Sequence, residues 1–132
     1  MDSSLFVALS NKRDNLHGRA VLMMKEILNY NYGKIFFSDY IFDESFTLFL
    51  ARTKNFKGAI DFGNTLLKSK DLNRLEVDAV VFSEAWGLIN AARAPISFTD
   101  ATSVVLMQKF GIQHIASFDS DFDKIPQIKR IS

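Results

Sequence analysis

Carboxylate side chains stand at the edges of the most apolar segments of this sequence. Asp100 lies within ISFTDATSVV, and Asp119, Asp121 and Asp123 follow in IASFDSDFDK. An aspartate in such a place can begin a helix by accepting hydrogen bonds from the first backbone N–H groups. Its oxygens can also hold a hard metal ion. Each of these residues therefore has a structural interpretation and a chemical one.

Glu44 is the most informative of the acidic residues. A helix through its segment would put Ile41, Glu44, Leu48 and Ala51 on one face, which we expect to pack against the core. A charged carboxylate on that face costs several kcal/mol unless it is paired. Glu44 therefore lies at the edge of the apolar face, pairs with an arginine, or faces a pocket as a metal ligand.

The aspartates have ordinary explanations when each is taken alone. Asp100 can cap a helix or interact favourably with its dipole, and Asp119 follows an expected strand, where aspartate commonly forms a turn. Asp121 and Asp123 are expected to be turn or surface residues, although Asp121 could join a site. Asp2 follows the first residue and by itself indicates no functional site.

The spacing of apolar residues predicts helices alternating with short strands. We expect helices at 5–9, 19–29, from Ser38 or Asp39 to about 52, at 55–69, from the cap Asp78 to about 92, and from Thr99 or Asp100 to the stop at Gly111. We expect strands at 34–38, 74–77, 112–118 and 127–131. Trp86 is predicted to lie in the core. This alternation predicts one α/β domain, residues 1–132, with a mainly parallel sheet, in which ligands bind beyond the carboxyl ends of the strands.

Composition narrows the possible functions. The chain has 132 residues, 48% of them hydrophobic, and a formal net charge of +1, so bulk charge does not attract it to nucleic acid or anionic lipid. It has no cysteine, which removes disulfides, thiol nucleophiles and thiolate metal sites. No signal-like or membrane-spanning apolar run appears. We therefore expect a soluble cytoplasmic protein.

Taken together, the motifs resemble the PIN domain, and most closely the VapC-type toxins of prokaryotic toxin–antitoxin pairs. The resemblance covers nearly the whole chain. It rests on DSS at 2–4 before an apolar run, SDYIFDESFTLFLAR around Glu44, SFTDATSVVLMQKFGI around Asp100, and IASFDSDFDKI with Ser117, Asp119 and Phe122. The stretch DNLHGRA also resembles an element common between the first two helices. No single motif is specific, but their order is.

The resemblance implies a three-layer α/β/α fold with a central parallel sheet and metal-dependent cleavage of RNA. It implies that Asp2, Glu44, Asp100 and Asp119 are the catalytic residues and the ligands of Mg²⁺ or Mn²⁺. Ser4 and Ser117 would support them by hydrogen bonds, with Asp121 as a further candidate. The implied partners are an RNA substrate, a small VapB-like antitoxin that inserts a segment into the pocket, and a second copy in a homodimer.

The chemistry of such a pocket follows from charge. Two carboxylates about 5 Å apart repel by roughly 3 kcal/mol at an effective dielectric constant near 20, so several together must bind protons or a cation. Oxygen ligands without histidine or cysteine suit Mg²⁺ or Mn²⁺. Such an ion can lower the pKa of a bound water and stabilise the leaving oxygen of a phosphodiester. A protein nucleophile is then not required.

The chain departs from the family pattern at its start. Family members have an apolar strand before the first aspartate, in the middle of the sheet, whereas only Met1 precedes Asp2 here. We therefore expect that the first strand is missing or shortened, or that the true start of the protein lies upstream of this sequence. This departure keeps open an alternative function, a PIN-like module that binds RNA or protein with weak or no catalysis.

A receiver-like signalling domain is a third possibility, because it too has acids at strand ends. It would need a central phosphoacceptor aspartate, and the middle strands are instead followed by Asp39 and Asp78, which resemble helix caps.

Overall fold

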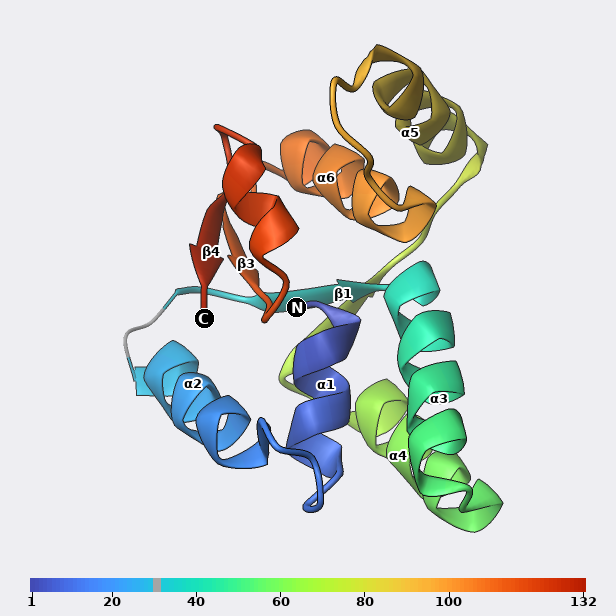
Figure 1. The fold of residues 1–132 in the computed structure, drawn as a ribbon, viewed down its shortest axis with the longest axis vertical. Coiled ribbons are helices and arrows are strands. Elements are labelled where there is room, and N and C mark those ends of the chain that lie inside the picture. The colour runs from blue at the N-terminus through green and yellow to red at the C-terminus, as the bar shows by residue number, and fades with distance from the viewer. Residues whose placement is uncertain (30–31) are drawn as a thin grey trace.

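The computed structural model describes residues 1–29 and 32–132. Its helices are α1 (Ser3–Ser10), α2 (His17–Asn29), α3 (Asp39–Thr53), α4 (Phe56–Lys68), α5 (Ala79–Ala91), α6 (Phe98–Phe110) and the short 3-10 helix η1 (Ser120–Lys124). The strands are β1 (Ile35–Ser38), β2 (Leu72–Leu75), β3 (His114–Ala116) and β4 (Lys129–Ile131). Figure 1 shows α1–α4 on one side of β1 and α5 and α6 on the other.

The strands form two parallel pairs, with β1 beside β2 and β3 beside β4. Two residues at the start of the chain connect the pairs. The Met1 amine donates to the Phe36 carbonyl in β1 at 2.7 Å, and the Asp2 N–H donates to the Ala116 carbonyl in β3 at 3.0 Å. The predicted α/β architecture with parallel strands is confirmed. Met1 and Asp2 thus lie between β1 and β3, and α1 follows them directly (Figure 1).

Side-chain caps fix where most helices begin. Ser38, Asn55 and Asp78 accept hydrogen bonds from the third N–H of α3, α4 and α5, as the sequence predicted. Ser97 caps α6, so the prediction that Thr99 or Asp100 begins this helix was wrong. Gly111 ends α6 in the left-handed conformation, with φ of 65°. The capping places Asp100 in the first turn of α6 rather than at its boundary.

The apolar residues form several contiguous clusters. One joins α1, β1, α3 and α4, and another joins α5 and α6 to the segment after β2. The prediction that Trp86 lies in the core was wrong. Trp86 is 58% exposed, and in α4 Phe62 is buried whereas Phe56, Ile60 and Leu67 are exposed. Both α4 and α5 carry apolar residues on more than one face, and spacing alone does not show which face meets the core.

The core-facing side of α3 is shifted from the predicted one. Ile41, Ser45 and Phe49 are buried, and Ala51 is exposed. Glu44 is half-buried at the edge of this face. Its carboxylate is thus close to the interior without being enclosed by apolar side chains.

The loop between α1 and α2 has a structural role. The Asp14 carboxylate accepts from the Leu16 N–H at 2.9 Å and pairs with Arg52 at 3.0 Å, and His17 Nδ1 lies 2.8 Å from the Ala8 carbonyl oxygen. The Arg52 pair attaches the loop to the end of α3, and the His17 contact joins the start of α2 to α1. β2 begins and ends two residues earlier than predicted. None of the helices in the described part of the chain is long and apolar enough to cross a membrane.

The cap of α3 provides a test of this packing. Ser38→Ala removes the hydroxyl that accepts from the Ile41 N–H at 3.0 Å in a buried position. We expect the free energy of unfolding to fall by about 1–2 kcal/mol, measured by urea denaturation. Ser10→Ala, at an exposed serine at the end of α1, is the control and should change stability little. Equal effects of the two substitutions would contradict the capping role.

Candidate active site

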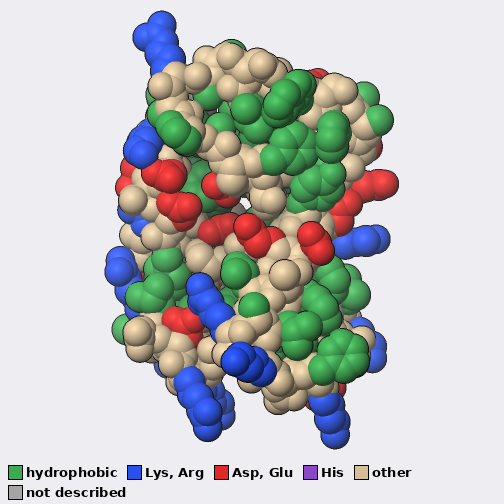
Figure 2. Space-filling view, turned by 45° about the vertical axis from the view of Figure 1, so that its right-hand side comes forward, with side chains coloured by type: hydrophobic (Ala, Val, Ile, Leu, Met, Phe, Trp, Pro, Cys, Tyr) green, Lys and Arg blue, Asp and Glu red, His purple; other side chains and the backbone are tan. Residues whose placement is uncertain are grey.

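Four carboxylates from four different parts of the chain converge between the two strand pairs. Asp2 precedes α1, Glu44 is in the second turn of α3, Asp100 is in the first turn of α6, and Asp119 precedes η1 just after β3. Asp100 lies close enough to the other three acids that their charges add to the increase in its pKa, which burial chiefly causes. In Figure 2, acidic side chains form a band between two groups of apolar side chains. The structure thus brings together all four acids that the sequence singled out.

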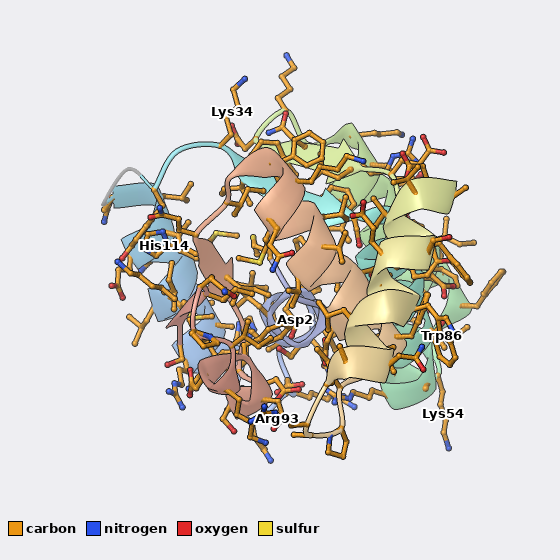
Figure 3. All side chains as sticks on the ribbon, turned by 90° about the horizontal axis from the view of Figure 1, so that it is seen from above. Asp2, Lys34, Lys54, Trp86, Arg93 and His114 are labelled. Atoms are coloured by element: carbon orange, nitrogen blue, oxygen red, sulfur yellow. The ribbon has the colours of Figure 1, made fainter. Side chains whose placement is uncertain are left out.

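Asp2 is the most enclosed member of the group. Its side chain is 4% exposed and lies at the centre of the molecule in Figure 3. Its Oδ2 accepts from the Ser4 hydroxyl at 2.8 Å and from the Ser117 hydroxyl at 2.7 Å. These two serines are therefore where the sequence predicted supporting hydrogen bonds, and they compensate the cost of burying the carboxylate.

Ser3 is a residue of the site that sequence reasoning did not single out. Its hydroxyl donates to Glu44 Oε2 at 2.7 Å and lies 3.5 Å from Asp2 Oδ1. It therefore links the carboxylates of α3 and the chain start. The signal was present in the motif DSS, where Ser3 follows Asp2 directly, but only the contact with a distant helix shows its role.

Asp119 is positioned through Ser117 and η1. Its backbone N–H donates to Ser117 Oγ at 3.0 Å, and its Oδ1 accepts from the Asp121 N–H at 2.8 Å. Ser117 thus contacts both Asp2 and Asp119. Asp121 is exposed, and its carboxylate pairs with Lys124, so it lies beside the group of four rather than within it.

Asp100 shows the electrostatic cost of the arrangement. Its pKa is raised from 3.8 to about 6, chiefly by burial, against the lowering effect of a hydrogen bond with Ser97. Repulsion from Asp2, Asp119 and Glu44 adds to the increase. A cation in the pocket would remove this repulsion and favour the ionised carboxylate.

The site offers oxygen ligands to a cation, but they are engaged with hydroxyl groups. No three histidine, cysteine or acidic side chains within residues 1–29 and 32–132 are already arranged to hold one metal ion together. Serine hydroxyls donate to Asp2 and Glu44. The donor set fits Mg²⁺ or Mn²⁺ in chemistry, and shared coordination requires side-chain rotations. The roles of these acids as metal ligands and catalytic residues stay predictions.

Comparisons with known proteins agree on one family. The PIN domain model matches residues 1–128. A 23S rRNA-specific endonuclease, VapC20, from two strains of Mycobacterium tuberculosis (CDC 1551 / Oshkosh and ATCC 25618 / H37Rv) is 32% identical to this chain over 124 residues. The match covers 92% of this chain and 89% of each relative.

The fold agrees as well. The crystal structure of Mycobacterium tuberculosis VapC20, described as a sarcin–ricin loop cleaving toxin, matches with a TM-score of 0.77 and 31% sequence identity. The match covers 93% of this chain and 91% of that one.

Ser117 is predicted to hold the site together. Ser117→Ala removes one of the two hydroxyls that donate to Asp2 Oδ2 and leaves the Asp119 N–H without its acceptor, at a fully buried position. We expect the free energy of unfolding to fall by about 1–3 kcal/mol, measured by chemical denaturation. Ser120→Ala, three residues away and exposed, is the matched control. A Ser117→Ala protein as stable as the parent would show that this hydroxyl is not needed.

Asp100 is predicted to make stability depend on pH. Because its pKa is higher in the folded protein than its ordinary value of 3.8, the folded state binds more protons between that value and about 6, and stability falls as pH rises through this range. Asp100→Asn should therefore raise the melting temperature at pH 7.5 in chelator-treated buffer by a few degrees. Asp61→Asn, an exposed acid of α4, should not. A lower melting temperature for Asp100→Asn would contradict the electrostatic cost.

Proposed function

The chain belongs to the PIN domain family and is of the VapC type, and from this membership we propose that it is a metal-dependent endoribonuclease toxin. Its substrate is RNA, whose phosphodiester bonds it hydrolyses with Mg²⁺ or Mn²⁺. The observation that carries the proposal is the convergence of Asp2, Glu44, Asp100 and Asp119. The relatives named 23S rRNA-specific endonuclease support RNA as the substrate class.

The residues of the site would act mainly by position and charge. Asp2 is held by Ser4 and Ser117, and Glu44 by Ser3, so two carboxylates have fixed directions before any substrate arrives. When bound, Mg²⁺ or Mn²⁺ would supply the charge that lowers the pKa of water and stabilises the leaving oxygen. With a pKa of about 6, Asp100 is largely ionised at neutral pH, and the cation would offset its repulsion from the other three acids. Water attacks the phosphorus in line, and the phosphorus–oxygen bond on the opposite side breaks.

The chain's own nucleophiles are arranged for support rather than attack. The hydroxyls of Ser3, Ser4 and Ser117 donate to carboxylates. Both histidines are engaged elsewhere, His17 with the Ala8 carbonyl and His114 against Tyr32. The site therefore has no serine–histidine pair that could form a covalent intermediate, which favours direct hydrolysis by water.

Protein partners are part of the proposal. We expect a homodimer in the cytoplasm that a small VapB-like antitoxin inhibits. Two exposed apolar faces support protein binding, one on α5 with Phe82 and Trp86, the other on α4 with Phe56, Ile60 and Leu67. Light scattering would test the dimer, and mixing with a candidate VapB-like antitoxin followed by copurification would test the inhibitor.

A binding module without catalysis is the second candidate. It is favoured by the hydrogen bonds that engage the carboxylates of Asp2 and Glu44, and by the lack of a ready-made ligand group among the described residues. Titration with Mn²⁺ separates the two functions, because only the nuclease requires a bound cation. Absence of Mn²⁺ binding would favour the module.

Removal of one carboxylate charge tests the nuclease directly. Asp100→Asn keeps the size of the side chain but removes the charge, and we expect RNA cleavage with Mg²⁺ or Mn²⁺ to fall about 100-fold or more. Cleavage of mixed RNAs is measured by gel electrophoresis. Asp61→Asn on α4 is the matched control and should retain activity. If Asp100→Asn cleaves RNA as fast as the parent, the site assignment is wrong.

A further inference from the structure

A hollow lies beside the group of four carboxylates. It has a volume of about 340 Å³ and is bounded by the end of α5, the loop before α6, one side of α6, and the segment that includes and follows η1. Asp100 lines its wall and also belongs to the acidic group. The hollow therefore adjoins the proposed cleavage site at Asp100.

The walls of this hollow are mainly apolar and rest on the core. Leu88, Ile96, Val104 and Ile125 line it. Val104 is buried, and the other three pack against the cluster that contains Val104 and Phe122. A pocket whose walls belong to the packed core keeps its shape, and apolar walls of this kind can enclose the faces of a planar ring.

The rim carries polar and charged groups. Gln108 from α6 and Gln127 after η1 are exposed amides, each able to donate and to accept hydrogen bonds. Arg93 adds positive charge, whereas Lys124 pairs with Asp121, which also lines the hollow. Figure 3 labels Arg93, which lies in the loop between α5 and α6. An apolar slot with amides and a cation at its rim matches a nucleotide, which has an apolar ring face, a polar ring edge and an anionic phosphate.

We propose that this hollow binds one unstacked base of the RNA strand, next to the phosphodiester held at the four carboxylates. The proposal rests on the proposed function, because the base lies next to the cleaved phosphodiester only if Asp100 belongs to the nuclease site. Gln108 and Gln127 read the edge of the base, and Arg93 contacts a neighbouring phosphate. The pocket makes cleavage depend on the base at one position of a single-stranded RNA.

The test uses Ala94→Trp, which fills the hollow from its exposed rim. Short single-stranded RNAs are prepared with an abasic nucleotide at each position in turn. For the parent, we expect one position at which loss of the base weakens binding and slows cleavage about tenfold. Ala94→Trp should weaken binding of the intact RNA by a similar factor and leave binding of that abasic RNA unchanged. Ala79→Trp, at the other end of α5, is the matched control.

Base reading is tested separately. Gln127→Ala should change which base is preferred at that position without altering cleavage of the abasic RNA, whereas Gln113→Ala, an exposed glutamine before β3, should change neither. If every abasic position behaves alike, or if Ala94→Trp binds intact RNA as the parent does, the pocket does not hold a base.

Two further outcomes separate this proposal from others. Binding is measured by fluorescence anisotropy without divalent metal, so the comparison of intact and abasic RNA stands even if the parent cleaves no RNA. That absence of cleavage would count against the nuclease alone. If Ala94→Trp disrupts an antitoxin complex but leaves RNA binding unchanged, the hollow holds a protein side chain and the base proposal is overturned.

Discussion

The mutual repulsion of four carboxylates is the constraint on which the rest of the structure depends. Asp2, Glu44, Asp100 and Asp119 come from separate elements, and the unfolded chain would keep them apart. The fold offsets the repulsion in two ways. Serine hydroxyls donate to Asp2 and Glu44, and Asp100 holds its proton to a higher pH than usual, with a pKa of about 6. Repulsion among the carboxylates destabilises the pocket when no cation is bound, so binding of a cation stabilises it. The instability of the site is in this way linked to its proposed chemistry.

The starts of two helices and the end of a strand position the four acids close together. The Ser38 and Ser97 caps set the rotation of α3 and α6, and thereby the directions of Glu44 and Asp100. Asp119 follows β3, and Asp2 hydrogen-bonds to β3 through its own backbone. The acids thus meet beyond the ends of parallel strands, where α/β proteins bind ligands. The hollow beside Asp100 lies at the same end of the molecule. The metal ion, the phosphate and the base would therefore bind at adjacent positions.

Much of this arrangement could be predicted from the sequence, because local rules decide it. Caps at Ser38, Asn55 and Asp78 and the stop at Gly111 follow from side chains that can bond their own backbone. The resemblance to PIN domains is confirmed by the family match. What failed depends on tertiary packing. Ser97, Thr99 and Asp100 can each cap a helix, and the choice is set by how α6 packs. Trp86 lies on a helix apolar on several sides, so its exposure depends on which side meets α6. The contact of Ser3 with Glu44 spans 41 positions and has no local signal.

The two separate strand pairs have a consequence for the order in which the protein folds. Each pair forms between segments that are fairly close in the chain, but the hydrogen bonds that join the pairs pass through Met1 and Asp2. The bond between Ser117 and Asp2 spans 115 positions. During synthesis, the Asp2 carboxylate therefore gains its buried partner Ser117 only after β3 has been made. A growing polypeptide at the ribosome would carry three of the four acids without an assembled centre. The group of four acids can therefore assemble only after β3 and Asp119 have been made, however early the other three acids emerge from the ribosome.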